Sequence, residues 1–289
     1  MYNILITGSN GQLGSELQVI AKQYPQYVFF FTDVAELDIT NLITIENFVK
    51  ENSIHTIINC AAYTAVDKAE SEELLADNIN HLAVKNLAKV AKEHRCQFIH
   101  ISTDYVFDGT NHQPYLETDI PNPQSVYGKT KLAGERAIQE INPSNSIIIR
   151  TSWVYSSFGA NFVKTMLKLG KEREELKVIS DQVGTPTYAA DLAKTILTIL
   201  PQLTNENVAV YHYTNEGVCS WYDFAQAIFE ITHTQCNVIP ISTAQYPTAA
   251  QRPHYSVLNK SKIKETYYLA IPFWRKSLND CLAVITHNS

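Results

Sequence analysis

Residues 3–14, "NILITGSNGQLG", join a short apolar run to three glycines that stand three positions apart. The apolar run predicts a buried strand, and helical spacing begins where the glycines end. Glycines at such a junction permit a tight turn, let backbone amides approach a pyrophosphate, and let the helix pack closely on the strand. The bare pattern would also fit a turn without a ligand, but its place between strand and helix favours a dinucleotide. The predicted contacts are Gly8, Asn10, Gly11, Gln12, Leu13 and Gly14.

Four more apolar runs rich in branched and aromatic residues follow along the chain, at 27–32, 54–59, 97–102 and 146–151. Segments with helical spacing separate them, and one of these carries the apolar residues Leu74, Leu75, Ile79, Leu82, Leu87 and Val90. Strands that are apolar throughout and alternate with helices predict a parallel sheet covered on both faces. The expected fold is therefore an α/β, Rossmann-type doubly wound sheet.

The alternation weakens after about residue 152, where prolines punctuate shorter elements. We therefore expect a dinucleotide-binding domain over 1–152 and a smaller, irregular substrate-binding lobe over 153–289. Two apolar runs of the second part, "LKVIS" at 176–180 and "VAVYHYT" at 208–214, are candidates to return to the sheet.

Composition narrows the classes of partner. The 289 residues carry a formal net charge of -6, so no overall basic field is available for nucleic acid. The start lacks the basic region of a signal peptide, and no apolar stretch is long enough to cross a membrane. Five scattered cysteines fit free thiols better than disulfides or a zinc site. These features predict a cytoplasmic protein that acts on a small molecule.

Asp33 closes the second apolar run, 25 residues after Gly8, where an acidic side chain can accept hydrogen bonds from an adenosine ribose. No lysine or arginine stands beside it in "FFFTDVAELDIT" to meet a 2'-phosphate, so NADH is somewhat favoured over NADPH. Asp33 would also fit a cap or turn residue. Asp38 and Ile39 are expected to border the adenine, although Asp38 could equally cap a helix that begins near Thr40.

Polar and small residues follow the third and fourth runs, at the edge where open parallel sheets bind ligands. Ala61 and Ala62 are small enough to let a cofactor pass closely. The same two stretches supply further candidates for the cofactor, Tyr63, Thr64 and Ile101, and for the substrate side, Val66. Asp67, Lys68 and Glu70 fit the start of a solvated helix better than a binding site.

Thr103, Tyr127 and Lys131 form the candidate catalytic centre. A hydroxyl at Thr103 can hydrogen-bond a carbonyl or alcohol oxygen, and Tyr127 and Lys131 share one helical face at i and i+4. A nearby ammonium favours the phenolate and is expected to move the pKa of Tyr127 toward the useful range. Lys131 can also hold the hydroxyls of a nicotinamide ribose. Taken singly, these residues would fit a polar turn and a solvated helix.

The chain resembles the extended short-chain dehydrogenase/reductases, and among them the dTDP-4-dehydrorhamnose reductase family. The residues that carry the resemblance are "ITGSNGQLG", "LDIT", "NCAAYTAVDKAE", "ISTDYVFDG", "YGKTKLAGE", "RTSWVY", "DQVGTPTYAADLA", "YHYTNEGVCSWYDFA" and "QRPHYSVLNKSKI". This resemblance implies reduction of the 4-keto group of dTDP-6-deoxy-L-lyxo-4-hexulose by NADPH or NADH to give dTDP-L-rhamnose. The resemblance implies that Tyr127 donates the proton, that Lys131 assists Tyr127 by its charge and holds the ribose, and that Thr103 completes the catalytic triad.

The resemblance also implies contacts to the sugar nucleotide from Val66, Thr103, Asp104, Tyr105, Trp153, Asn161 and Arg252. Trp153 would otherwise be a core aromatic, and Arg252 would fit an ordinary salt bridge nearly as well as a diphosphate contact. The family usually has glycine after "WVY", whereas this chain has Ser156, so a loop beside the substrate is expected to differ.

Some members of the family dimerise through a structural Mg2+ held by acidic residues, so a homodimer is conceivable, but nothing in this sequence establishes such a site. We expect no metal in the chemistry, because a ketone polarised by two hydroxyls needs no Lewis acid. Two other functions remain open at this level. One is a dinucleotide-binding regulatory subunit similar to that of methionine adenosyltransferase, and the other is a reductase or epimerase for a different nucleotide sugar.

Overall fold

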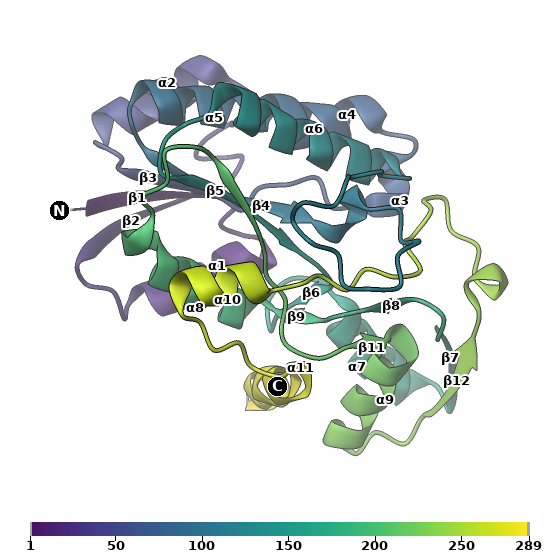
Figure 1. Ribbon diagram of the computed structural model, residues 1–289. Helices are drawn as coiled ribbons and strands as arrows, with labels where there is room; N and C mark the ends of the chain where they lie inside the picture. Colours follow the sequence, from purple (N-terminus) through teal and green to yellow (C-terminus); the bar gives the residue numbers. More distant parts are fainter. Residues whose placement is uncertain (1, 288–289) are drawn as a thin grey trace.

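A sheet of six parallel strands runs through the centre of the molecule (Figure 1). The computed structural model describes residues 2–287, and across the sheet the order is β2-β1-β3-β4-β5-β10. The strands are β1 (Tyr2–Thr7), β2 (Tyr27–Thr32), β3 (Thr56–Asn59), β4 (Gln97–Thr103), β5 (Ser146–Thr151) and β10 (Ala209–His212). The predicted doubly wound α/β fold is confirmed.

Helices cover both faces of this sheet, as Figure 1 shows. On one face lie α1 (Gln12–Ala21), α8 (Ala189–Ile199) and α10 (Ser261–Tyr267), and on the other α2 (Leu42–Glu51), α5 (Ala83–Glu93) and α6 (Val126–Ile141). Branched residues of the strands fill both interfaces, which explains why the strands read as apolar throughout.

The segment after β3 departs from the expected regular helix. It forms α3 (Val66–Ala69), α4 (Glu73–Asp77) and a π-helical turn at Asn78–Leu82 that leads into α5. A π turn holds more residues than an α-helical turn, so side chains before it point in other directions than α-helical spacing predicts. The apolar residues before α5 therefore do not line up with those of α5. Leu74 is 88% exposed and Leu82 is 43% exposed. The helical spacing of these apolar residues predicts that they share one face, and this prediction was therefore wrong.

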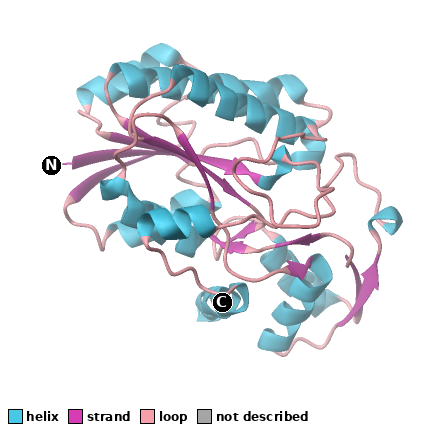
Figure 2. Ribbon diagram, viewed as in Figure 1, coloured by secondary structure: helices cyan, strands magenta, loops and turns pink. Residues whose placement is uncertain are grey.

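A second core lies beside the carboxyl ends of the main strands (Figure 2). It is built from α7 (Phe162–Glu172), α9 (Trp221–Thr232), α11 (Trp274–His287) and three strand pairs: β6 (Val154–Tyr155) with β9 (Thr187–Tyr188), β7 (Glu175–Ile179) with β12 (Asn237–Ile241), and β8 (Val183–Gly184) with β11 (Cys219–Ser220). The run at 208–214 returns to the main sheet as β10, whereas "LKVIS" forms β7 in the second core.

Candidate functional site

A cavity of about 690 Å³ opens at the carboxyl ends of β1, β3, β4 and β5, between the sheet and the second core. The strand order reverses between β1 and β3, and such switch points are where open α/β sheets bind ligands. The predicted residues that line the cavity are Gly8, Gly11, Gln12, Leu13, Asp33, Asp38, Ile39, Ala61, Ala62, Thr64, Val66, Ile101, Thr103, Asp104, Tyr105, Tyr127, Lys131 and Trp153. Most of the predicted residues are thus brought together.

The glycine turn has the shape that a dinucleotide requires. Gly8 adopts φ +65°, and a Cβ there would come within 2.6 Å of the Ala61 backbone. A Cβ at Gly14 would meet the Gly8 carbonyl oxygen at 2.5 Å. No side chain caps α1, so its first amides are free of side-chain partners and can face an anion. Gly14 and Asn10 do not line the cavity but shape the turn that does.

Asp33 and Asp38 stand at the end of the cavity beside β2. The carboxylate of Asp33 accepts hydrogen bonds from the amides of Asn10 (3.0 Å) and Val34 (2.8 Å), which fix its orientation. Asp38 accepts from the hydroxyl and amide of Thr40, and these bonds lower its pKa. The cap of α2 is Asn41, so interpreting Asp38 as the helix cap was wrong.

The candidate catalytic groups meet because α6 packs closely on the end of β4. Ser125 caps the helix by accepting a hydrogen bond from the Gly128 amide at 3.2 Å. A Cβ at Gly128 would lie 2.2 Å from the Tyr105 carbonyl oxygen, so only glycine allows this approach. Tyr127, in the first turn, is thereby brought to Thr103 at the mouth of the sheet, and both line the cavity.

Burial dominates the acidity of Tyr127 and Lys131. It raises the pKa of Tyr127 to about 12, and hydrogen bonding with the Thr103 side chain only opposes the rise. The expected lowering of this pKa by Lys131 is therefore not found in the free protein. A phenol that stays protonated at neutral pH suits a proton donor. Burial also lowers the pKa of Lys131 to about 8, against the opposing charge of Glu135.

Asp104 is a buried carboxyl beside this centre. Its Oδ1 accepts a hydrogen bond from Thr103 Oγ1 at 3.1 Å, and its buried Oδ2 has no hydrogen-bond partner among residues 2–287. Burial raises the pKa of Asp104 to about 7, and the hydroxyls of Ser256 and Thr103 oppose the rise. Asp104 also lines the cavity, so its carboxyl stands beside the candidate catalytic hydroxyl of Thr103.

Trp153 forms the wall opposite the sheet. It holds φ +49°, a strained conformation for a bulky residue, and its ring stacks on Trp221 with centroids 3.6 Å apart. Trp221, the first residue of α9, was missed by the sequence analysis, because nothing in "CSWYDFA" marks it as a neighbour of "RTSWVY". Trp153 lines the cavity and Trp221 does not, so the ring of Trp221 supports the ring of Trp153.

Besides Asn10 and Gly14, three predicted residues do not line the cavity. Tyr63 directs its phenol to Glu72, away from the site. Asn161 caps α7 through its Oδ1 and donates from Nδ2 to Gln12 Oε1 at 3.0 Å. Arg252 forms a two-pronged ion pair with Asp67, with N···O distances of 2.6 and 3.1 Å, which is the salt bridge that the sequence analysis allowed. Direct ligand contacts from these three stay predictions.

Ser156 explains part of the difference expected after "WVY". Its hydroxyl donates to Glu16 Oε1 on α1 at 2.6 Å and accepts from the Phe158 amide at 2.9 Å. The loop that follows brings Gly159 and Ala160 into the cavity wall near Gln12, and the sequence analysis did not predict either residue. The hydrogen bond from Ser156 to Glu16 thus holds this loop against α1, the helix that follows the glycine turn.

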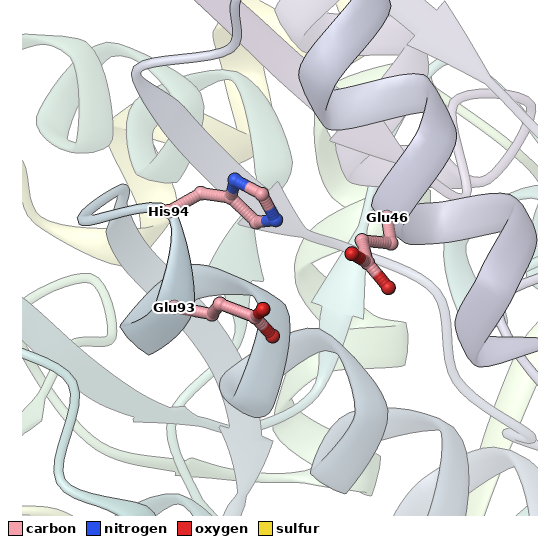
Figure 3. A group of neighbouring side chains, drawn as sticks. All are labelled: Glu46, Glu93 and His94. Carbon is pink, nitrogen blue, oxygen red and sulfur yellow. The ribbon is translucent and has the colours of Figure 1, made fainter.

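One group of side chains resembles a metal site but lies elsewhere. Glu46 of α2 faces Glu93 and His94 at the end of α5 (Figure 3), with ligand atoms within 4.8 Å of one another. This group does not line the cavity. The ammonium of Lys50 already pairs with Glu46 at 2.6 Å, so the carboxylate has a partner without a metal ion.

Comparison with known proteins gives consistent relatives. A family model described as the RmlD substrate binding domain matches residues 2–287. A dTDP-4-dehydrorhamnose reductase from Aggregatibacter actinomycetemcomitans is 42% identical over 98% of this chain and 99% of its own. One from Escherichia coli K12 is 44% identical over 94% of each.

Solved structures agree. A dTDP-4-dehydrorhamnose reductase from Clostridium acetobutylicum has a TM-score of 0.94 at 45% identity, covering 98% of this chain and 99% of that one. One from Bacillus anthracis, solved in complex with NADP, has a TM-score of 0.93 at 40% identity, covering 98% of this chain and all of that one. No helix within residues 2–287 is both long and apolar enough to span a membrane. The chain therefore belongs to the RmlD family, together with the dTDP-4-dehydrorhamnose reductases.

Proposed function

We propose that this protein transfers hydride from NADH or NADPH to the 4-keto group of dTDP-6-deoxy-L-lyxo-4-hexulose and releases dTDP-L-rhamnose. The observation that carries the proposal is a single cavity in which Thr103, Tyr127 and Lys131 stand between a dinucleotide turn and an aromatic wall. The relatives named for this reaction match the chain over nearly its full length. The glycine turn leaves the close approach that such a cofactor needs.

The dinucleotide, when bound, supplies the hydride that adds to C4 of the sugar. Tyr127 donates its phenolic proton to the carbonyl oxygen as that oxygen gains negative charge, so the ketone becomes an alcohol. Thr103 Oγ lies beside the phenol and stabilises the same oxygen. The ammonium of Lys131 holds the ribose and favours the phenolate that remains. Asp104, which lines the same cavity, is the proposed contact for a sugar hydroxyl.

The direct test is an absorbance assay. The protein is incubated with NADH or NADPH and with enzymatically generated dTDP-4-keto-6-deoxy-L-sugar, and the reduced nicotinamide band is followed. We expect the band to disappear only when the sugar nucleotide is present. Lack of oxidation with either cofactor would refute the proposal. Oxidation that yields a different nucleotide sugar would redirect it to another substrate.

We infer a preference for NADH over NADPH from the charges that stand at the cavity. Lys131 is the only lysine or arginine among the described residues that line it, and Asp33 and Glu36 stand together at the β2 end, with the Asp33 amide donating to Glu36 Oε2 at 2.9 Å. A 2'-phosphate there would meet carboxylates, which repel it.

We therefore expect a higher kcat/KM with NADH, and we expect Asp33→Ser to shift the NADPH to NADH ratio toward NADPH by about tenfold. Steady-state rates with both cofactors measure this ratio. Glu51→Gln, on the solvated end of α2, is the matched removal of an acid outside the cavity. A ratio that Asp33→Ser leaves unchanged would separate Asp33 from cofactor choice.

A further inference from the structure

A chain of buried polar side chains runs behind the catalytic lysine. Thr7 Oγ1 donates to Asn59 Oδ1 at 2.7 Å, Asn59 Nδ2 lies 3.0 Å from His100 Nδ1, and His100 Nε2 lies 3.3 Å from Lys131 Nζ. The groups come from the neighbouring strands β1, β3 and β4 and from α6, and all are at most 1% exposed. Polar groups buried this deeply are held in defined hydrogen-bonding roles.

The roles along the chain follow from one backbone group. The amide of Ala61 can only donate, and it contacts Asn59 Oδ1 at 3.1 Å, so this atom is the acceptor and Nδ2 must face His100. Nδ2 in turn can only donate, so His100 Nδ1 carries a lone pair. Burial lowers the pKa of His100 well below its ordinary value, so the ring is neutral. Its single proton therefore sits on Nε2 and points at Lys131.

This proton has opposite consequences for the two forms of Lys131. A neutral amine has a lone pair that can accept from His100 Nε2–H, whereas an ammonium has donors only. In the ammonium form two donors oppose each other across 3.3 Å, and only the bond from Nζ to the Ile101 carbonyl at 2.7 Å remains favourable. His100 thus favours the uncharged lysine in the free protein.

We propose that His100 is a positioning residue of the reductase: aimed by Asn59, its Nε2–H disfavours the ammonium of Lys131 and so sets the pH above which the free enzyme loses the charge that holds the cofactor. The kinetic part rests on the function proposed above for Lys131. The tautomer of His100 does not depend on that function.

Other groups near Lys131 raise or lower its pKa. Glu135 lies one turn further along α6 and raises the pKa of Lys131, although Arg150 of β5 pairs with that carboxylate. Cys60, after β3, also raises it, and burial opposes both. The net result is the pKa of about 8. The kcat/KM for the reduced dinucleotide should therefore fall as the pH rises above about 8.

Two substitutions test the link to Lys131. His100→Gln removes the fixed N–H and can turn its carbonyl toward Lys131, so the alkaline fall of kcat/KM should move up by about one pH unit. Asn59→Asp should move it in the same direction, because a carboxylate accepts the proton of His100 at Nδ1 and leaves the Nε2 lone pair facing the ammonium. His212→Gln, the same change at a second buried histidine outside the cavity, should leave the profile unchanged.

The wild-type protein gives a test that needs neither turnover nor a variant. Nitrogen-15 NMR of histidine-labelled protein without cofactor should show His100 neutral and protonated at Nε2, with the assignment made from the signal that is lost in His100→Gln and shifted in Asn59→Asp. A proton at Nδ1 would overturn the proposal. So would an alkaline fall of kcat/KM that stays at the same pH, or moves to a lower pH, in folded His100→Gln or Asn59→Asp. Absence of reductase activity with the Nε2 tautomer present would refute the proposed function alone.

Discussion

Replacing Tyr127 with phenylalanine is expected to lower kcat by about 100-fold or more and to leave the affinity for the dinucleotide nearly unchanged. The phenol is the group that we propose as the proton donor to the carbonyl oxygen, and its pKa of about 12 keeps that proton in place at neutral pH. The ring itself only packs edge-on against Tyr105, with centroids 5.4 Å apart, and phenylalanine preserves this contact.

The measurement for this variant separates chemistry from binding. Single-turnover rates report the loss of the proton, and fluorescence titration with the reduced cofactor reports affinity. Tyr115→Phe is the matched control, because Tyr115 is a buried tyrosine outside the cavity whose phenol contacts Asp108. Equal turnover in Tyr127→Phe and the parent protein would remove Tyr127 from the mechanism.

Arg150→Met is expected to lower the free energy of unfolding by about 3–5 kcal/mol, because it leaves the Glu135 carboxylate buried and without its cation. The two side chains are 4% and 1% exposed, and Arg150 Nη2 lies 2.6 Å from Glu135 Oε2. A second bond from Arg150 Nε, at 3.0 Å, fixes the pair. The pair joins β5 to the helix that carries Tyr127 and Lys131, so activity should fall with stability.

Urea unfolding of the variant measures this loss. The control is the double variant Arg150→Met with Glu135→Leu, which removes both charges and should recover most of the stability, since an apolar pair of similar volume fits a buried site. A loss below about 1 kcal/mol in the single variant would show that water reaches Glu135 and that the pair does not hold α6.

The sheet could be predicted from the sequence because its strands are apolar on both faces and end in residues with distinct roles. The runs at 27–32 and 146–151 coincide with β2 and β5. The glycine turn was also predictable, since Gly8 and Gly14 occupy positions where any Cβ would collide with backbone.

Other features depend on contacts between distant segments, which a local pattern does not contain. The spacing of Leu74 and Leu82 looked helical, but a π turn that serves the cavity wall rotates them toward solvent. The contacts of Asn161 with α7 and with Gln12 likewise join segments that are far apart in the sequence. His100 appeared only as one polar residue in an apolar run, and its role follows from Asn59 on the neighbouring strand.

The step proposed for this protein is the passage of hydride to C4 of the nucleotide sugar in the cavity beside Tyr127. The most direct measurement uses NADH deuterated at C4 on each face in turn, with NMR of the purified sugar nucleotide. We expect one of the two labelled cofactors to place a single deuterium at C4 of dTDP-L-rhamnose. A product without deuterium from either cofactor, or with deuterium at another carbon, would contradict the claim.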